Sequence, residues 1–128
     1  MRVDLGRGLL ALVLLVACSD KGGVDSAGPC SRSPPLTYDN FGHGLLNQYC
    51  NGCHSSILPA DARENAPVGV DFNTYEGVLT WAERIQARAT PEGATMPPGG
   101  GPDATDRAML DEWITCTVLP EKARWEAQ

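Results

Sequence analysis

The residue types most able to do chemistry gather in one short stretch of this 128-residue chain, YCNGCH at residues 49–54. Two cysteines separated by two residues and followed by a histidine are compatible with a disulfide loop, half of a zinc site or a haem anchor. Structural zinc requires four ligands, usually from two separated pairs, but the only other histidine is His43 and no second Cys-x-x-Cys is present. A thioredoxin-like redox pair requires a βαβ setting, and a plain Cys50–Cys53 disulfide leaves His54 without a role.

The order Cys-x-x-Cys-His in an exported protein strongly favours covalent haem. In this chemistry the thiols of Cys50 and Cys53 add to the two vinyl groups, and the adjacent imidazole of His54 reaches the iron. We therefore predict one haem c, attached through Cys50 and Cys53, with His54 as the proximal iron ligand. A haem-free disulfide protein is the alternative.

The N-terminus supports export. Arg2 and Arg7 precede an apolar run at residues 9–17, the pattern of a secretory signal, and this run is too short to span a bilayer. It ends in Leu-Val-Ala-Cys at residues 15–18, which resembles the lipobox of bacterial lipoproteins and implies cleavage before Cys18 and lipid attachment to it. We expect residues 1–17 to be a signal peptide and the mature protein to be anchored in the bacterial cell envelope, facing the periplasm, on either the inner or the outer membrane. An ordinary signal peptide is the alternative.

Residues 18–37 are rich in Gly, Ser and Pro and lack an apolar period, so we expect a flexible tether that reaches roughly 25 Å. Residues 38–128 then form one small domain. The signal peptide contains two of the 10 basic and one of the 16 acidic residues, which leaves 8 and 15 in the mature chain, a net charge of −7. Such an acidic balance argues against nucleic-acid binding, which requires a basic footprint.

Apolar residues recur at helical spacing in three later segments. These are residues 39–53, capped by Thr37 or Asp39; residues 74–89, with a capping box from Asn73 and Glu76; and residues 105–119, stopped by Pro120. Residues 90–102 contain too much Pro and Gly for a helix or strand, and no segment alternates as a strand does. We predict an all-α domain of three main helices around a covalent haem.

At these residues the chain resembles a class I cytochrome c, over about residues 37–120. The Cys-x-x-Cys-His motif matches the attachment site of that family. Gly42 and Leu46, eight and four residues before the first cysteine of the motif, resemble the positions at which the family's first and last helices cross. The resemblance places them against Leu110 and Trp113.

The stretch TMPP at residues 95–98 resembles the family's distal-ligand loop, which implies Met96 as the distal iron ligand. The proline after Met96 favours an extended backbone there. Met109 lies on the apolar stripe of the third helix and is expected to pack in the core, while His43, on the haem-bearing helix, should not reach the opposite face of the iron. Residues 55–73 match no feature of the family.

The resemblance implies a carrier of single electrons between redox proteins at the membrane, which is not an enzyme and takes no small-molecule substrate. Ligation by His54 and Met96 raises the reduction potential and keeps both oxidation states six-coordinate. One alternative is a haem protein with an open iron position that acts as a gas sensor or peroxidatic catalyst. Another is a haem-free lipoprotein that serves as an assembly module.

Four further residues concern the surroundings of the haem. We expect Trp81 to pack, and Arg84 and Arg88 to face water rather than the haem carboxylates. A carbonyl near Pro59 is a candidate acceptor for the Nδ1–H of His54.

Two cysteines are left when Cys18 is assigned to lipid and the motif cysteines to haem. We predict that Cys30 and Cys116 form a disulfide, the usual state of cysteines in an oxidising compartment, and that it pins the end of the tether to the last helix. Cys116 as a small buried hydrophobic residue is the alternative.

The lipid anchor predicts how Cys18→Ser behaves. Lipoprotein processing adds two or three acyl chains, enough for lasting attachment where one chain is marginal. The variant should remain uncleaved or leave the membrane fraction, with an unchanged haem domain, as measured by fractionation and immunoblotting. Equal membrane retention of correctly cleaved variant and wild type would refute the anchor.

Overall fold

The computed structural model describes residues 28–128, and no strand occurs among them. In chain order the elements are the π-helical turn η1 (Tyr38–Gly42), α1 (His43–Tyr49), the 3-10 turn η2 (Ala60–Ala62), α2 (Tyr75–Ala89), α3 (Ala104–Trp113), the π-helical turn η3 (Ile114–Val118) and α4 (Leu119–Glu126). The all-α class predicted from the sequence is confirmed. The proposed signal peptide and Cys18 lie outside the described residues.

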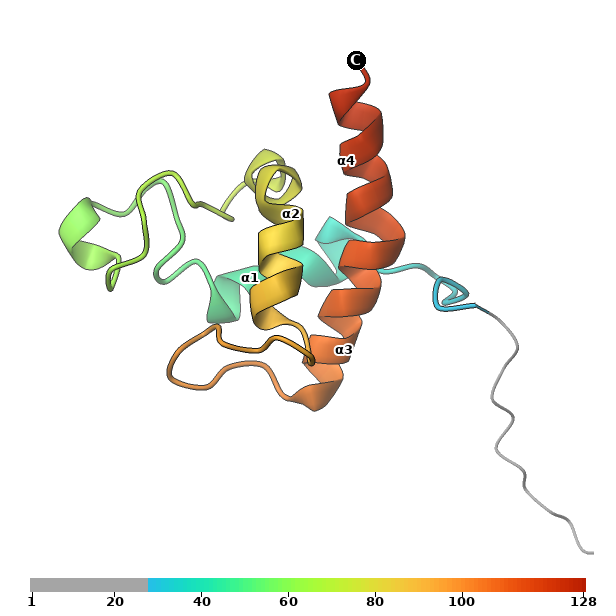
Figure 1. Ribbon diagram of the computed structural model, residues 1–128, viewed down its shortest axis with the longest axis horizontal. Coiled ribbons are helices and arrows are strands. Elements are labelled where there is room, and N and C mark those ends of the chain that lie inside the picture. Colours follow the sequence, from blue (N-terminus) through green and yellow to red (C-terminus); the bar gives the residue numbers. More distant parts are fainter. Residues whose placement is uncertain (1–27) are drawn as a thin grey trace, which may run out of the picture.

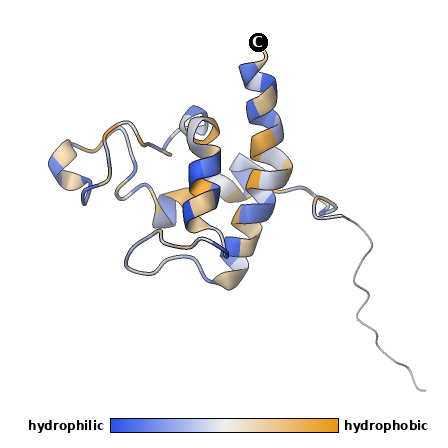
Figure 2. Cartoon of the chain, in the orientation of Figure 1, coloured by the Kyte–Doolittle hydropathy of each residue, from blue (hydrophilic) through white to orange (hydrophobic). Residues whose placement is uncertain are grey.

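The helices pack beside one another at one end of the molecule, and a long loop leaves them. Figure 1 shows α3, η3 and α4 as one continuous helical rod with α2 alongside it, while residues 50–74 project to the side. In Figure 2, α2 carries alternating hydrophobic and hydrophilic bands, as an amphipathic helix does. Its buried residues are Val78, Leu79, Ala82, Ile85 and Ala89. Within the described part of the chain, no helix is long and apolar enough to cross a membrane.

The first helical segment begins as predicted but ends early. Thr37 caps it, with the Thr37 side chain accepting from the Asn40 N–H and the Asn40 side chain accepting from the Thr37 N–H. The helix ends at Tyr49, not at Cys53 as predicted. Asn and Gly are poor helix formers, and both follow the first motif cysteine, so the motif folds as a turn.

The contact between the first and last helices depends on the absence of a side chain at Gly42. A Cβ atom there would overlap the ring of Trp113, and Phe41 meets the same ring edge-on with centroids 6.1 Å apart. Leu46 and Leu110 are fully buried in the same cluster. The placement of Gly42 against Trp113 is therefore confirmed. The Trp113 Nε1 atom is buried with no hydrogen-bond partner among the described residues, so apolar packing alone holds the ring.

The capping box predicted for α2 is wrong. Thr74 is the cap, and its side chain accepts from the Gly77 N–H. The Asn73 side chain is engaged elsewhere, because it accepts from the Ser56 N–H at 2.9 Å and donates to the Ser56 hydroxyl. This exchange ties the start of α2 to the loop that follows the motif.

Pro120 does not end the last helix, contrary to the sequence prediction. The π-helical turn η3 lies directly before it, where the Leu119 N–H donates to the Ile114 carbonyl, five residues back. Pro120 then occupies the first turn of α4. A proline is tolerated at the start of a helix, where its missing N–H is not needed. The widened turn thus lets the helical rod continue to Glu126.

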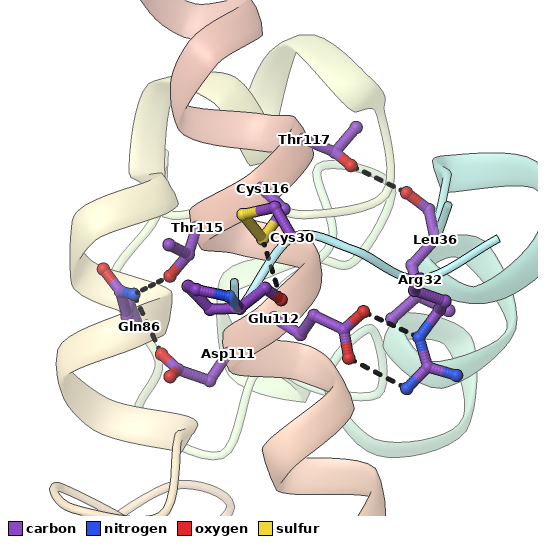
Figure 3. The surroundings of a disulfide bond; sticks show 10 residues. Cys30, Arg32, Leu36, Gln86, Asp111, Glu112, Thr115, Cys116 and Thr117 are labelled. Atoms are coloured by element: carbon purple, nitrogen blue, oxygen red, sulfur yellow. Dashed lines mark hydrogen bonds and ion pairs between the residues drawn. A yellow bond between two sulfur atoms is a disulfide. The ribbon is translucent and has the colours of Figure 1, made fainter. Parts of the chain in front are cut away.

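The end of the proposed tether belongs to the folded domain. A disulfide joins Cys30 to Cys116 across 86 residues, the two cysteines that the count left over. Figure 3 shows Arg32 paired with Glu112 and the Thr117 hydroxyl donating to the Leu36 carbonyl close to this bond. Leu36 is buried. Residues 30–37 are therefore held on the last helix, as expected for a disulfide that pins the end of the tether there.

Removal of the disulfide should lower stability substantially. For a loop of this length the chain-entropy model gives about 4–5 kcal/mol. We expect the double variant Cys30→Ser/Cys116→Ser to show this loss in chemical denaturation, whereas Arg32→Gln, which removes a neighbouring exposed ion pair, should change stability little. Free thiols at both positions in native protein, found by peptide mapping without reductant, would contradict the bond.

Candidate cofactor site

The predicted haem residues line one cavity of about 470 Å³. Cys50, Cys53 and His54 enter it from the turn after α1, and Met96 enters it from the loop between α2 and α3. Apolar side chains complete the wall, among them Leu45, Phe72, Ile85, Ala89 and Leu110. The tertiary structure thus brings together side chains that are more than 40 residues apart.

The two motif thiols are free and lie near the wall of this cavity. No disulfide joins Cys50 to Cys53. Burial raises the pKa of the Cys50 thiol to about 11, against a lowering influence of Arg107. Reactive dithiol sites require a depressed thiol pKa, so Cys50 is poorly suited to disulfide exchange.

Two contacts, a hydrogen bond and a ring stack, fix the orientation of the His54 imidazole. Its Nδ1 lies 2.9 Å from the Val70 carbonyl oxygen, and its ring stacks on Phe72 with centroids 4.6 Å apart. A carbonyl oxygen can only accept, so Nδ1 carries the proton and the Nε2 lone pair is left for a metal. The acceptor is Val70, not a carbonyl near Pro59 as expected from the sequence.

Arg63 is a functional candidate that sequence reasoning missed. Its side chain is 1% exposed and donates to the carbonyls of Ser55, Ala66, Pro67 and Val70 and to the carboxylate of Asp71. This single guanidinium therefore organises the loop that supplies the acceptor for His54. The only signal in the sequence was an arginine eight residues before an aspartate, in a loop where arginine is normally exposed.

Met96 is held through its backbone. Its N–H donates to the Arg88 carbonyl at 2.9 Å, and its own carbonyl accepts from Arg107 Nη1 at 2.9 Å. The residue is 39% exposed. Met109 packs against the core, as predicted, and His43 is an exposed residue that bonds to Asn47 and does not line the cavity. Met96 is thus the methionine placed to face the cavity.

Arg107 does for the Met96 loop what Arg63 does for the His54 loop. It donates to the carbonyls of Ala89 at 2.7 Å, Met96 at 2.9 Å and Pro102 at 3.0 Å. These three carbonyls span the whole connection from the end of α2 to the start of α3. The loop that presents Met96 is therefore closed by one side chain from α3.

Trp81, Arg84 and Arg88 also line the cavity. Trp81 is half-buried and its Nε1–H donates to the Gly69 carbonyl at 3.1 Å. Arg84 and Arg88 are exposed, and both line the cavity. No carboxylate partner for either arginine occurs in the described part of the chain.

The residues of the site fit a covalent haem. The volume lies in the range of about 300–1,000 Å³ typical of cofactor sites, and the wall is mainly apolar, as such sites are. Two thiols, an imidazole with a free Nε2 and a thioether sulfur face one space. Within residues 28–128 no cluster of three or more His, Cys, Asp or Glu could hold a bare metal ion.

No protein-family model, curated protein or solved structure matches this chain.

Loss of the Arg107 side chain should loosen the Met96 loop. Hydrogen bonds to charged donors contribute about 1.5–3 kcal/mol, and Arg107→Met leaves three carbonyls without their donor. We expect a loss of about 2–3 kcal/mol in chemical denaturation and faster amide exchange at residues 94–102. Arg84→Met, which removes an exposed cavity arginine without hydrogen bonds, is the matched control. Equal stability of the two variants would rule out the bridging role.

Proposed function

We propose that this protein is a membrane-anchored, monohaem c-type cytochrome that carries single electrons between redox proteins of the bacterial cell envelope. The observation that carries the proposal is the convergence of Cys50, Cys53, His54 and Met96 on one cavity. The lipid anchor at Cys18 and the periplasmic location are supported by the sequence pattern of residues 1–18 alone.

Each of these residues has a distinct task in the proposed site. Cys50 and Cys53 attach the haem through thioethers, and the rigid turn between them sets where the group is held. His54, protonated at Nδ1 and bonded to Val70, offers its Nε2 lone pair. Met96 offers its sulfur from the opposite loop. The bound haem supplies an iron that cycles between its ferric and ferrous states.

This ligand set favours a carrier over a catalyst. A thioether is a soft ligand that raises the reduction potential when paired with histidine. Met96, whose backbone is held by bonds to Arg88 and Arg107, would supply this sulfur in both oxidation states. Closed coordination leaves no position for a substrate, so electrons are the cargo and other redox proteins are the partners.

Covalent haem is tested on a denaturing gel. Wild-type protein made in a host with haem-attachment machinery should retain peroxidase-type staining after denaturation, and Cys50→Ser/Cys53→Ser should not. The Cys30→Ser/Cys116→Ser protein is the matched control, because it also loses two cysteines but should still stain. An unstained wild-type band would refute the proposed function.

The role of Met96 separates a carrier from a catalyst. We expect Met96→Ala to keep its covalent haem, to have a lower midpoint potential, and to bind carbon monoxide when reduced, because the sixth iron position is then open. Optical titration measures all three. Met109→Leu, a change of similar volume at a core methionine, should behave as wild type. Ready carbon monoxide binding by the wild type, with an unchanged spectrum and potential in Met96→Ala, would contradict electron carriage.

A further inference from the structure

One backbone oxygen in the proposed site receives two donors. The Val70 carbonyl lies 2.9 Å from His54 Nδ1 and 3.2 Å from Arg63 Nη2. A carbonyl oxygen has two lone pairs and can accept both bonds. The imidazole that is proposed to bind iron and a buried guanidinium are therefore coupled through a single atom.

The second donor is a charged group that is costly to bury. Removing a cation from water requires compensating contacts, and Arg63 obtains them from four carbonyls and the Asp71 carboxylate, which lies 2.6 Å from Nη2. The Asp71 side chain is 20% exposed. Asp71 Oδ1 is thus paired with Nη2, the same guanidinium nitrogen that donates to the Val70 carbonyl.

Two donors on one oxygen compete for the same electron density. A cationic donor draws density from the Val70 carbonyl and weakens it as an acceptor for the neutral Nδ1–H of His54. The Nδ1 proton of His54 is then held more tightly by the imidazole and is shared less with the Val70 oxygen. An imidazole whose N–H is bonded less strongly is a weaker donor at its other nitrogen, because acceptor strength at Nδ1 sets ligand basicity.

We propose that Arg63 is a positioning residue that sets the donor strength of His54 through the Val70 carbonyl, and that it thereby raises the reduction potential of the site. This inference rests on the proposed haem function. Asp71 has the opposite effect, because it draws Arg63 Nη2 away from Val70 and neutralises part of its charge. The loop at residues 55–73 accordingly serves to bring one cation to the back of the proximal histidine.

Two substitutions test the coupling from opposite sides. Arg63→Lys keeps the positive charge but loses the planar fork that reaches several carbonyls at once. Asp71→Asn keeps Arg63 and frees its Nη2 to donate more strongly to Val70. A purely structural role for the loop would loosen both variants in the same direction, so opposite shifts identify the coupling. Asp61→Asn is the control, since it removes the same charge from an exposed residue of the same loop.

The measurements are made on the haem-loaded protein. In the reduced state we expect the His54 Nδ1 proton resonance to move downfield in Arg63→Lys and upfield in Asp71→Asn. The midpoint potential should fall in Arg63→Lys and rise in Asp71→Asn by more than in Asp61→Asn. Asp71→Asn retains the whole Arg63 network of carbonyl bonds, so it gives a result even if Arg63→Lys does not fold.

The outcomes separate this inference from the function on which it rests. Covalent haem with the resonance and the potential unchanged in Asp71→Asn relative to Asp61→Asn would overturn the role of Arg63 and leave the cytochrome assignment standing. Shifts of the same sign in both loop variants would also overturn it. Absence of covalent haem from the wild type would overturn both.

Discussion

Two loops without a hydrogen-bond ladder form much of the cavity wall, and their inward carbonyl groups must find donors. Residues 50–74 and 90–103 contain only the short turn η2 as regular structure, so helix and sheet bonding cannot satisfy them. An unpaired buried carbonyl costs about 1–3 kcal/mol. Arg63 and Arg107 together supply donors to seven carbonyls in these loops and at the end of α2. Without them the loops could not hold His54 and Met96 toward a common space.

Within residues 28–128, arginines without a carboxylate partner gather at the cavity of this acidic chain. The protein has a formal net charge of −6, yet Arg84, Arg88 and Arg107, the described cations without a carboxylate partner, all lie at the cavity or its Met96 loop. Elsewhere the described cations are paired, as Lys122 is with Glu83. Positive charge at this position would disfavour the oxidised form of the iron in the proposed haem site, in the same direction as the proposed methionine ligation.

The helical rod supports the site from behind. Gln86 of α2 donates to both Asp111 and Thr115 (Figure 3), which joins α2 to the rod on the side away from the cavity. The disulfide and the Thr117–Leu36 bond fasten the chain before α1 to the same rod. Trp113 against Gly42 fixes α1 in turn, and α1 ends at the Cys-x-x-Cys-His motif. These contacts together fix the positions of the helices that surround the cavity in a small domain with few large apolar residues.

The sequence alone determined the Cys-x-x-Cys-His motif, the three helical faces, the position of Gly42 and the two cysteines left to pair. These features depend only on residue types and on their separation along the chain, which are the same before and after folding. Only the tertiary structure decided the continuation through Pro120, the Thr74 cap and the contacts of Val70, Arg63 and Arg107. For Val70, Arg63 and Arg107 the physical reason is that the contacts end on backbone carbonyls. Every residue carries one, so residue types do not reveal which carbonyl a distant guanidinium or imidazole will meet.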